Sequence, residues 1–203
     1  IQQDADGFEC DVRLSSDNEL VLWHDEDLQR VAQSPLKVAD ATYARLKEAC
    51  EILTVEDLLN LAIQHKKNIA FETKHPVPTK QRVERLLTRY LTARKSEIEA
   101  AGITITIMSF SWWAVQRIMR SPFPAVQLLW NDRGLKLNRA GIVSIEMTQI
   151  REDRALVERL KSQGKRVYVW TVNEVDDAKL AHQAGVDVII TDKPGLIKKS
   201  IGK

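Results

Sequence analysis

Two carboxylates and a histidine near the start of the chain have the types and spacing to bind a cation and transfer protons. Glu9 and Asp11 stand two apart on the polar face of an alternating segment, so their carboxylates point to the same side. Carboxylates placed in this way repel each other, and each has a raised pKa unless a cation joins them. A solvated strand face is the alternative interpretation, and for these two residues alone it is the better one. His24 and Asp25, which end the next apolar run, favour a metal and acid/base site.

A strand, a turn and a second strand are the elements that must position these groups. Apolar and polar residues alternate from Phe8 to Arg13, which is the period of a β-strand. The segment Ser15-Ser16-Asp17-Asn18 favours a turn, because such side chains bond to their own backbone. The apolar run from Glu19 to Trp23 then delivers His24.

A third carboxylate and a lysine lie on a later expected strand, from Asn68 to Thr73. Glu72 and Lys74 are two apart, so they share a face if the strand continues to Lys74. A structural ion pair between them is the plainer interpretation, and it is compatible with a functional role for both.

Strand-like and helix-like segments alternate along the rest of the chain. Glycines end three of the helical segments, at Gly102, Gly164 and Gly185, each before a strand. This alternation predicts βα units, a parallel sheet and an α/β fold. Seven sheet strands are expected, near residues 8, 69, 103, 125, 142, 167 and 186, with 20–23 as an excursion from the first. Helices are expected over 43–48, 54–67, 79–101, 112–120, 151–163 and 175–184, with a short one from 194 and an irregular stretch over 25–39. A closed (β/α)₈ barrel needs eight strands, so one strand–helix unit is missing from the pattern.

Composition favours a globular protein. The chain has 203 residues, 44% hydrophobic and 29% charged, with a formal net charge of +2. Its basic residues are spread along the chain, which argues against a nucleic-acid partner, and no apolar run is long enough for a transmembrane segment. The two cysteines, Cys10 and Cys50, weakly favour a reducing, cytoplasmic location, although an exported form without its signal would look the same and a disulfide stays open.

Six motifs, in order and near the right spacing, resemble those of the glycerophosphodiester phosphodiesterase family, a TIM-barrel family of metal-dependent hydrolases. The motifs are A-D-G-F-E-C-D-V at 5–12, L-W-H-D with the following leucine and arginine at 22–30, E-T-K at 72–74, S-F at 109–110, W-T-V-N at 170–173 and T-D-K-P at 191–194. The similarity covers essentially the whole chain. The expected fold is therefore an α/β TIM (β/α)₈ barrel, as a single domain over residues 1–203.

The resemblance implies roles for six residues. Glu9, Asp11 and Glu72 would bind one divalent cation, Mg²⁺ or Ca²⁺, for which carboxylate oxygens are suitable ligands. His24 would be one of a pair of histidines that act as general acid and base. Lys74 would lie beside the phosphate, and Trp170 would line the substrate side of the pocket, with core packing as the competing interpretation for Trp170.

One part of the family pattern has no counterpart in these residues. The family begins with an H-R-G strand, which supplies the other catalytic histidine and a phosphate-binding arginine. Its absence before Ile1 coincides with the missing eighth strand, so we expect the first strand and helix of the barrel to be absent from the sequence as given.

The resemblance implies metal-dependent hydrolysis of glycerophosphodiesters to sn-glycerol 3-phosphate and an alcohol. A related phosphodiesterase, or a phospholipase-D-like lyase acting on lysophospholipids, is one alternative on the same barrel. A non-catalytic barrel that binds phosphate-bearing ligands is another, and the intact acidic residues and lysine argue against it. The head group, the physiological metal and the oligomeric state stay open.

Overall fold

The computed structural model describes residues 1–131 and 139–202. Contacts within the chain gather into two compact units. We name residues 7–123 the first unit, and residues 1–6 together with 124–203 the second unit. The single domain expected over residues 1–203 stays a prediction.

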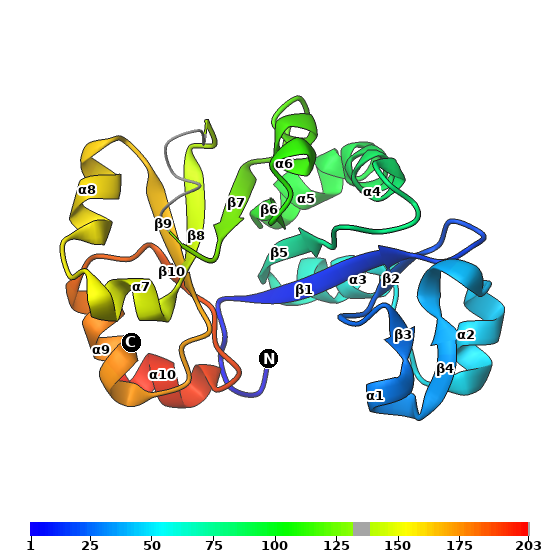
Figure 1. Cartoon of the computed structure of the whole chain (residues 1–203), viewed down its shortest axis with the longest axis horizontal. Helices are drawn as coiled ribbons and strands as arrows, with labels where there is room; N and C mark the ends of the chain where they lie inside the picture. The colour runs from blue at the N-terminus through cyan, green and yellow to red at the C-terminus, as the bar shows by residue number, and fades with distance from the viewer. Residues whose placement is uncertain (132–138, 203) are drawn as a thin grey trace. The chain divides into compact units, whose positions relative to one another are not determined.

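The first unit is built on a sheet with the order β6-β5-β1-β2 (Figure 1). Its strands are β1 (Gly7–Leu14), β2 (Leu20–Leu22), β5 (Asn68–Thr73) and β6 (Ile105–Ser109). Strands β1, β5 and β6 are parallel, and β2 returns antiparallel along β1. The expected excursion at 20–23 is thus confirmed as a return strand, and it joins the sheet.

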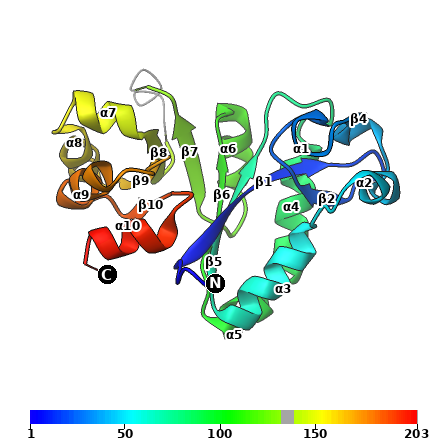
Figure 2. The same ribbon diagram turned by 90° about the horizontal axis from the view of Figure 1, so that it is seen from below.

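Helices pack against this sheet, and a small subdomain follows β2. The helices are α3 (Val55–His65), α4 (Arg82–Ala93), α5 (Lys95–Ala101) and α6 (Trp112–Ile118). The subdomain holds β3 (Asp27–Leu28), α1 (Gln29–Ala32), β4 (Ser34–Lys37), a 3₁₀ turn (Val38–Asp40) and α2 (Tyr43–Ala49) (Figure 2). Elements β3, α1, β4 and the 3₁₀ turn replace the irregular stretch that was expected over 25–39, whereas α2 confirms the helix expected over 43–48. Helix α3 begins at the predicted cap, where Thr54 Oγ1 accepts from the Asp57 N–H at 3.1 Å.

The second unit has a parallel sheet with the order β10-β9-β8-β7. Its strands are β7 (Ala125–Leu129), β8 (Ile142–Glu146), β9 (Arg166–Trp170) and β10 (Val188–Ile189). Its helices are α7 (Met147–Glu152), α8 (Leu156–Ser162), α9 (Val175–Gln183) and α10 (Pro194–Ser200). The alternation of strands and helices predicted from the sequence is therefore confirmed in both units.

Two helices expected to be continuous are broken, so those two predictions were wrong. The first breaks at Arg94, whose guanidinium donates to Tyr90 Oη at 3.0 Å and to Glu97 at 2.6 Å. The second breaks at Asp153, whose side chain accepts from the backbone N–H of Ala155 at 3.1 Å. The bond of Asp153 to a backbone N–H competes with the helical ladder, whereas those of Arg94 join side chains only, and hydrophobic periodicity reveals neither.

Gly7 allows β1 to approach β5 closely. A Cβ at Gly7 would lie 2.5 Å from the carbonyl oxygen of Asn68, which is a backbone atom and cannot rotate away. We expect Gly7→Ala to destabilise the protein by about 1–3 kcal/mol through overpacking, as measured by urea unfolding. Gly141→Ala is the matched control, because a Cβ at Gly141 meets nothing within 4 Å. Equal stability of the two variants would contradict the close approach.

Candidate active site

Three carboxylates meet on the parallel pair β1 and β5. The register places Asp11 opposite Glu72, and residues that face each other across a parallel pair share one face of the sheet. Glu9 lies on the same face, two residues before Asp11. One oxygen from each of Glu9, Asp11 and Glu72 lies within 4.8 Å of the others. The face predicted from the sequence is thus confirmed, and the structure brings all three side chains together.

Lys74 forms ion pairs with two of the carboxylates in this acidic cluster. Its Nζ lies 2.7 Å from Asp11 Oδ1 and 3.0 Å from Glu72 Oε1. The side chain of Lys74 is 15% exposed, and those of Asp11 and Glu72 are 19% and 10% exposed. The ion pair with Glu72 that the spacing indicated is therefore present, and Asp11 shares it.

The pKa shifts of Glu72 and Lys74 indicate that positive charge stabilises this acidic cluster. Burial raises the pKa of Glu72, and the neighbouring Lys74 offsets this only in part. Burial alone would lower the pKa of Lys74, but Glu72 and Asp11 outweigh it and the pKa is raised. Lys74 therefore stays charged, while the buried carboxylate still gains from any further cation brought close to it.

The hairpin of β1 and β2 carries His24 to this cluster. The register pairs Val12 with Leu22, and the Trp23 N–H donates to the Asp11 carbonyl at 2.9 Å. His24 is the next residue, and Arg13 donates to its carbonyl oxygen at 2.9 and 3.1 Å. The structure thus brings His24 beside the carboxylates, as the sequence predicted.

Asp25 and Arg30 orient the imidazole of His24. The Nδ1 atom of His24 lies 2.7 Å from Asp25 Oδ1, and Arg30 Nε lies 2.6 Å from Asp25 Oδ2. The hydrogen bond from His24, followed by that from Arg30, lowers the pKa of Asp25. An ionised Asp25 keeps the proton on Nδ1, which leaves Nε2 of the neutral ring as a proton acceptor. The motif at 22–30 includes Asp25 and Arg30, but their roles were missed in the sequence.

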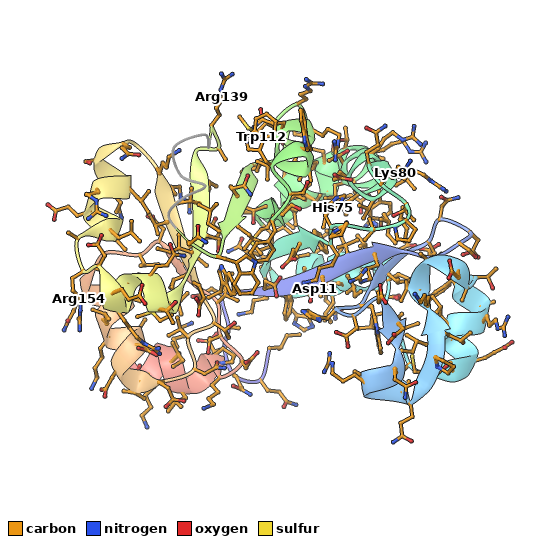
Figure 3. The ribbon with its side chains drawn as sticks, in the orientation of Figure 1. Asp11, His75, Lys80, Trp112, Arg139 and Arg154 are labelled. Carbon is orange, nitrogen blue, oxygen red and sulfur yellow. The ribbon has the colours of Figure 1, made fainter. Side chains whose placement is uncertain are left out.

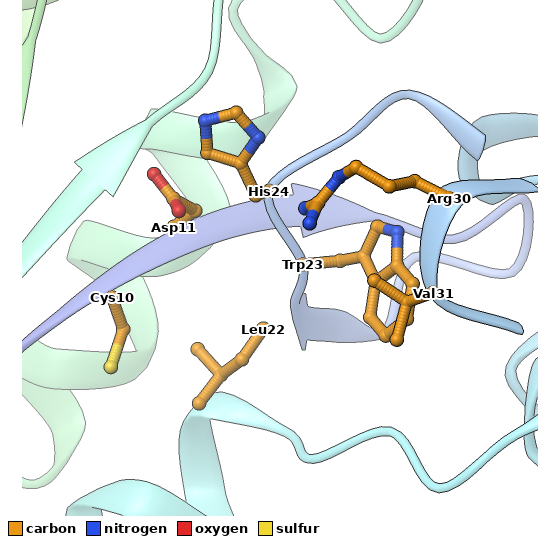
Figure 4. A pocket seen from close by; sticks show the side chains of 7 residues that line it. All are labelled: Cys10, Asp11, Leu22, Trp23, His24, Arg30 and Val31. Carbon is orange, nitrogen blue, oxygen red and sulfur yellow. The ribbon is translucent and has the colours of Figure 1, made fainter. Parts of the chain in front are cut away.

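A pocket adjoins these groups in the first unit. It has a volume of about 240 Å³, and Figure 4 shows its seven lining side chains. They are Cys10, Asp11, Leu22, Trp23, His24, Arg30 and Val31. In Figure 4 the side chains of Asp11 and His24 lie on one side of β1, whereas those of Cys10 and Leu22 lie on the other.

The thiol in this pocket is not a nucleophile. Burial, followed by the charges of Glu9 and Asp11, raises the pKa of Cys10 to about 12. Because the thiolate is the reactive form, Cys10 stays inert at neutral pH. Both Cys10 and Cys50 are free thiols, so the disulfide left open by the sequence is not formed.

The acidic cluster fits a hard divalent cation. All its donors are carboxylate oxygens, the type that Mg²⁺ and Ca²⁺ prefer, and neutral nitrogen or thiolate donors are not among them. The raised pKa of Glu72 shows that this carboxylate is not fully compensated by Lys74. Glu9, Asp11 and Glu72 are therefore the residues that could hold the ion.

Trp170 lies in the second unit, at the end of β9. Its ring packs edge to face on Trp130, with centroids 4.8 Å apart and an interplanar angle of 82°. This aromatic contact supports the packing interpretation of Trp170. Its role at the substrate stays a prediction.

A second ionic cluster in the first unit was missed in the sequence. Glu84 Oε1 lies 3.0 Å from His75 Nε2 and 2.7 Å from Arg117 Nη2, and the Glu84 side chain is only 2% exposed. The available signal was that Glu84 lies on the apolar stripe of α4, three residues before Leu87 and seven before Leu91. A charged residue on such a stripe needs a partner.

A sequence model of the Glycerophosphoryl diester phosphodiesterase family matches residues 1–196. The chain belongs to this family. As a family member it is a phosphoric diester hydrolase. A probable glycerophosphodiester phosphodiesterase 1 of Mycobacterium tuberculosis is 32% identical over 228 aligned residues, which cover 98% of this chain and 82% of the relative.

Solved structures of the glycerophosphodiester phosphodiesterase family show the same fold. The enzyme from Thermotoga maritima has a TM-score of 0.80 at 24% identity and covers 98% of this chain and 86% of its own. A phosphodiesterase from Oleispira antarctica, in complex with the product sn-glycerol-3-phosphate, has a TM-score of 0.80 at 20% identity and covers 100% and 87%. The fold class predicted from the sequence, an α/β TIM barrel, is confirmed.

Proposed function

We propose that this protein hydrolyses glycerophosphodiesters to sn-glycerol 3-phosphate and an alcohol, with one divalent cation, Mg²⁺ or Ca²⁺. The observation that carries the proposal is the cluster of Glu9, Asp11 and Glu72 beside Lys74 and His24. Family membership supports it, as does the product bound to the Oleispira antarctica relative.

His24, Lys74 and Trp170 each have a role in this proposal. His24 accepts or gives a proton at Nε2, because Asp25 holds the proton on Nδ1. Lys74 provides a buried positive charge for a phosphate oxygen. Trp170 contacts the glycerol carbons, a role that rests on the resemblance alone.

Glu9, Asp11 and Glu72 hold the cation in this proposal. When bound, a divalent cation supplies positive charge for the phosphoryl oxygens as a Lewis acid.

No described helix is long and apolar enough to cross a membrane. A cytoplasmic location stays a prediction.

Removal of the metal tests the proposal. After treatment with EDTA, we expect release of sn-glycerol 3-phosphate from a glycerophosphodiester to stop, and to return with Mg²⁺ or Ca²⁺. Asp11→Asn should weaken the binding of the active metal by about tenfold or more in calorimetry, since even outer-shell changes cost that much. The exposed carboxylate Asp176 gives the control, Asp176→Asn, which should bind like the unaltered chain.

Product analysis separates the alternatives. A cyclic phosphate product would assign the chain to the lyases instead. If the protein binds glycerol 3-phosphate but hydrolyses no diester with Mg²⁺ or Ca²⁺, it is a non-catalytic ligand-binding protein. Hydrolysis that persists in EDTA at full rate would overturn the metal site.

A further inference from the structure

Helix α4 of the first unit presents a basic face to solvent. Lys80, Arg82, Arg85 and Arg89 are all exposed, and the three arginines follow the spacing of one helix face. Among the described residues, no ion pair joins any of the four to a carboxylate. The only acidic residue from 76 to 96 is Glu84, which is buried against Arg117 and does not offset these charges.

Helix α6 presents two tryptophans. Trp112 is 39% exposed and Trp113 is 68% exposed, which is unusual for such large apolar side chains. Their rings lie edge to face, with centroids 4.7 Å apart and an interplanar angle of 79°. The segment from 110 to 124 contains no acidic residue.

These two helices pack against each other. The ion pair of Arg117 with Glu84, at 2.7 Å, joins α6 to α4, and both views of the chain show the helices side by side (Figures 1 and 2). Figure 3 labels Lys80, in the turn before α4, and Trp112, on α6. We name this area the basic–tryptophan surface, and it consists of Lys80, Arg82, Arg85, Arg89, Trp112 and Trp113.

The basic–tryptophan surface begins at the edge of the sheet that holds the candidate active site. Helix α4 follows β5, which ends beside Glu72 and Lys74, and α6 follows the parallel strand β6. The first turns of both helices therefore lie at the carboxyl edge of these strands, where the site groups of β5 also lie. A partner on this surface would meet the first unit near that edge.

We propose that the basic–tryptophan surface binds the anionic phospholipid surface of a bilayer. Arginine and lysine side chains are attracted to anionic head groups, and tryptophan rings insert at the boundary between head groups and acyl chains. A nucleic acid fits this surface less well, because the edge-to-face rings do not offer parallel faces to successive bases. This binding is independent of the proposed hydrolysis and is measured without it.

Vesicle co-sedimentation of the full chain tests the proposal. We expect binding to vesicles of equal parts phosphatidylcholine and phosphatidylglycerol, no binding to phosphatidylcholine alone, and weakening with added salt. Each basic residue near an anionic surface adds about fivefold to affinity, so the triple variant Arg82→Gln, Arg85→Gln, Arg89→Gln should bind about 100-fold more weakly. Trp113→Ser should lose about tenfold through the lost apolar burial.

Matched controls distinguish a defined surface from overall charge. The triple variant Arg45→Gln, Arg154→Gln, Lys179→Gln removes the same charge from exposed positions on other elements. Leu196→Ser removes an apolar side chain that is 48% exposed elsewhere. Both should bind vesicles like the unaltered chain, and thermal melts confirm that every variant is folded. Equal loss in the two triple variants, binding to a DNA duplex but not to anionic vesicles, or no vesicle binding at all would overturn the proposal.

Discussion

His24→Ala is expected to lower kcat for a glycerophosphodiester by about 10²–10⁴-fold, the contribution of a positioned general acid or base. The reason is geometric: Nδ1 is held by Asp25 at 2.7 Å, and the ring lines the pocket next to Asp11. Because His24 transfers a proton and does not hold the substrate in this proposal, KM should change much less than kcat. Steady-state kinetics at saturating metal provide the measurement.

Two further variants show whether the effect belongs to His24 as a proton carrier. His65→Ala removes an exposed histidine at the end of α3 and should leave kcat unchanged. Asp25→Asn keeps the shape of the Asp25 side chain but weakens its hold on Nδ1, so it should lower kcat less than His24→Ala does. A His24→Ala enzyme with a normal kcat would remove His24 from the mechanism.

Glu84→Ala is expected to destabilise the protein by about 3–5 kcal/mol, the cost of breaking a buried ion pair from one side. Glu84 is 2% exposed as a side chain, and its loss leaves His75 and Arg117 without their shared partner. Urea unfolding provides the measurement. Glu99→Ala is the control, because the Lys95–Glu99 pair is exposed and should contribute only about 0.3–0.5 kcal/mol. A loss no larger than that of the control would contradict a structural role for Glu84.

The same cluster gives the protein an acid-sensitive contribution to stability. Burial alone would raise the pKa of Glu84, but hydrogen bonds from His75 and Arg117 outweigh it and the pKa falls below its ordinary 4.5. A carboxyl with a lowered folded-state pKa stabilises the fold fully above 4.5, and this stability is lost as the pH falls through the folded-state pKa. Glu84→Gln should therefore flatten the acid limb of a plot of unfolding free energy against pH. An unchanged acid limb in Glu84→Gln would assign the acid sensitivity to other carboxylates.

Local sequence determined the elements and the faces on which the site groups stand. The two-residue period of a strand put Glu9 and Asp11 on one face, and Glu72 and Lys74 on one face of another strand. Thr54 predicted the start of α3, because a side-chain cap depends only on residues within one helical turn. The alternation of strands and helices likewise predicted an α/β fold.

Tertiary structure alone decided which of these groups meet. The register of β1 on β5 sets Asp11 opposite Glu72, and bonds between residues far apart in the chain fix that register. The breaks at Arg94 and Asp153 coincide with side-chain hydrogen bonds that no hydrophobic period records. The burial of Glu84 and the exposure of Trp113 depend on how α4 and α6 pack, since a side chain's partners and its contact with water are properties of the folded chain.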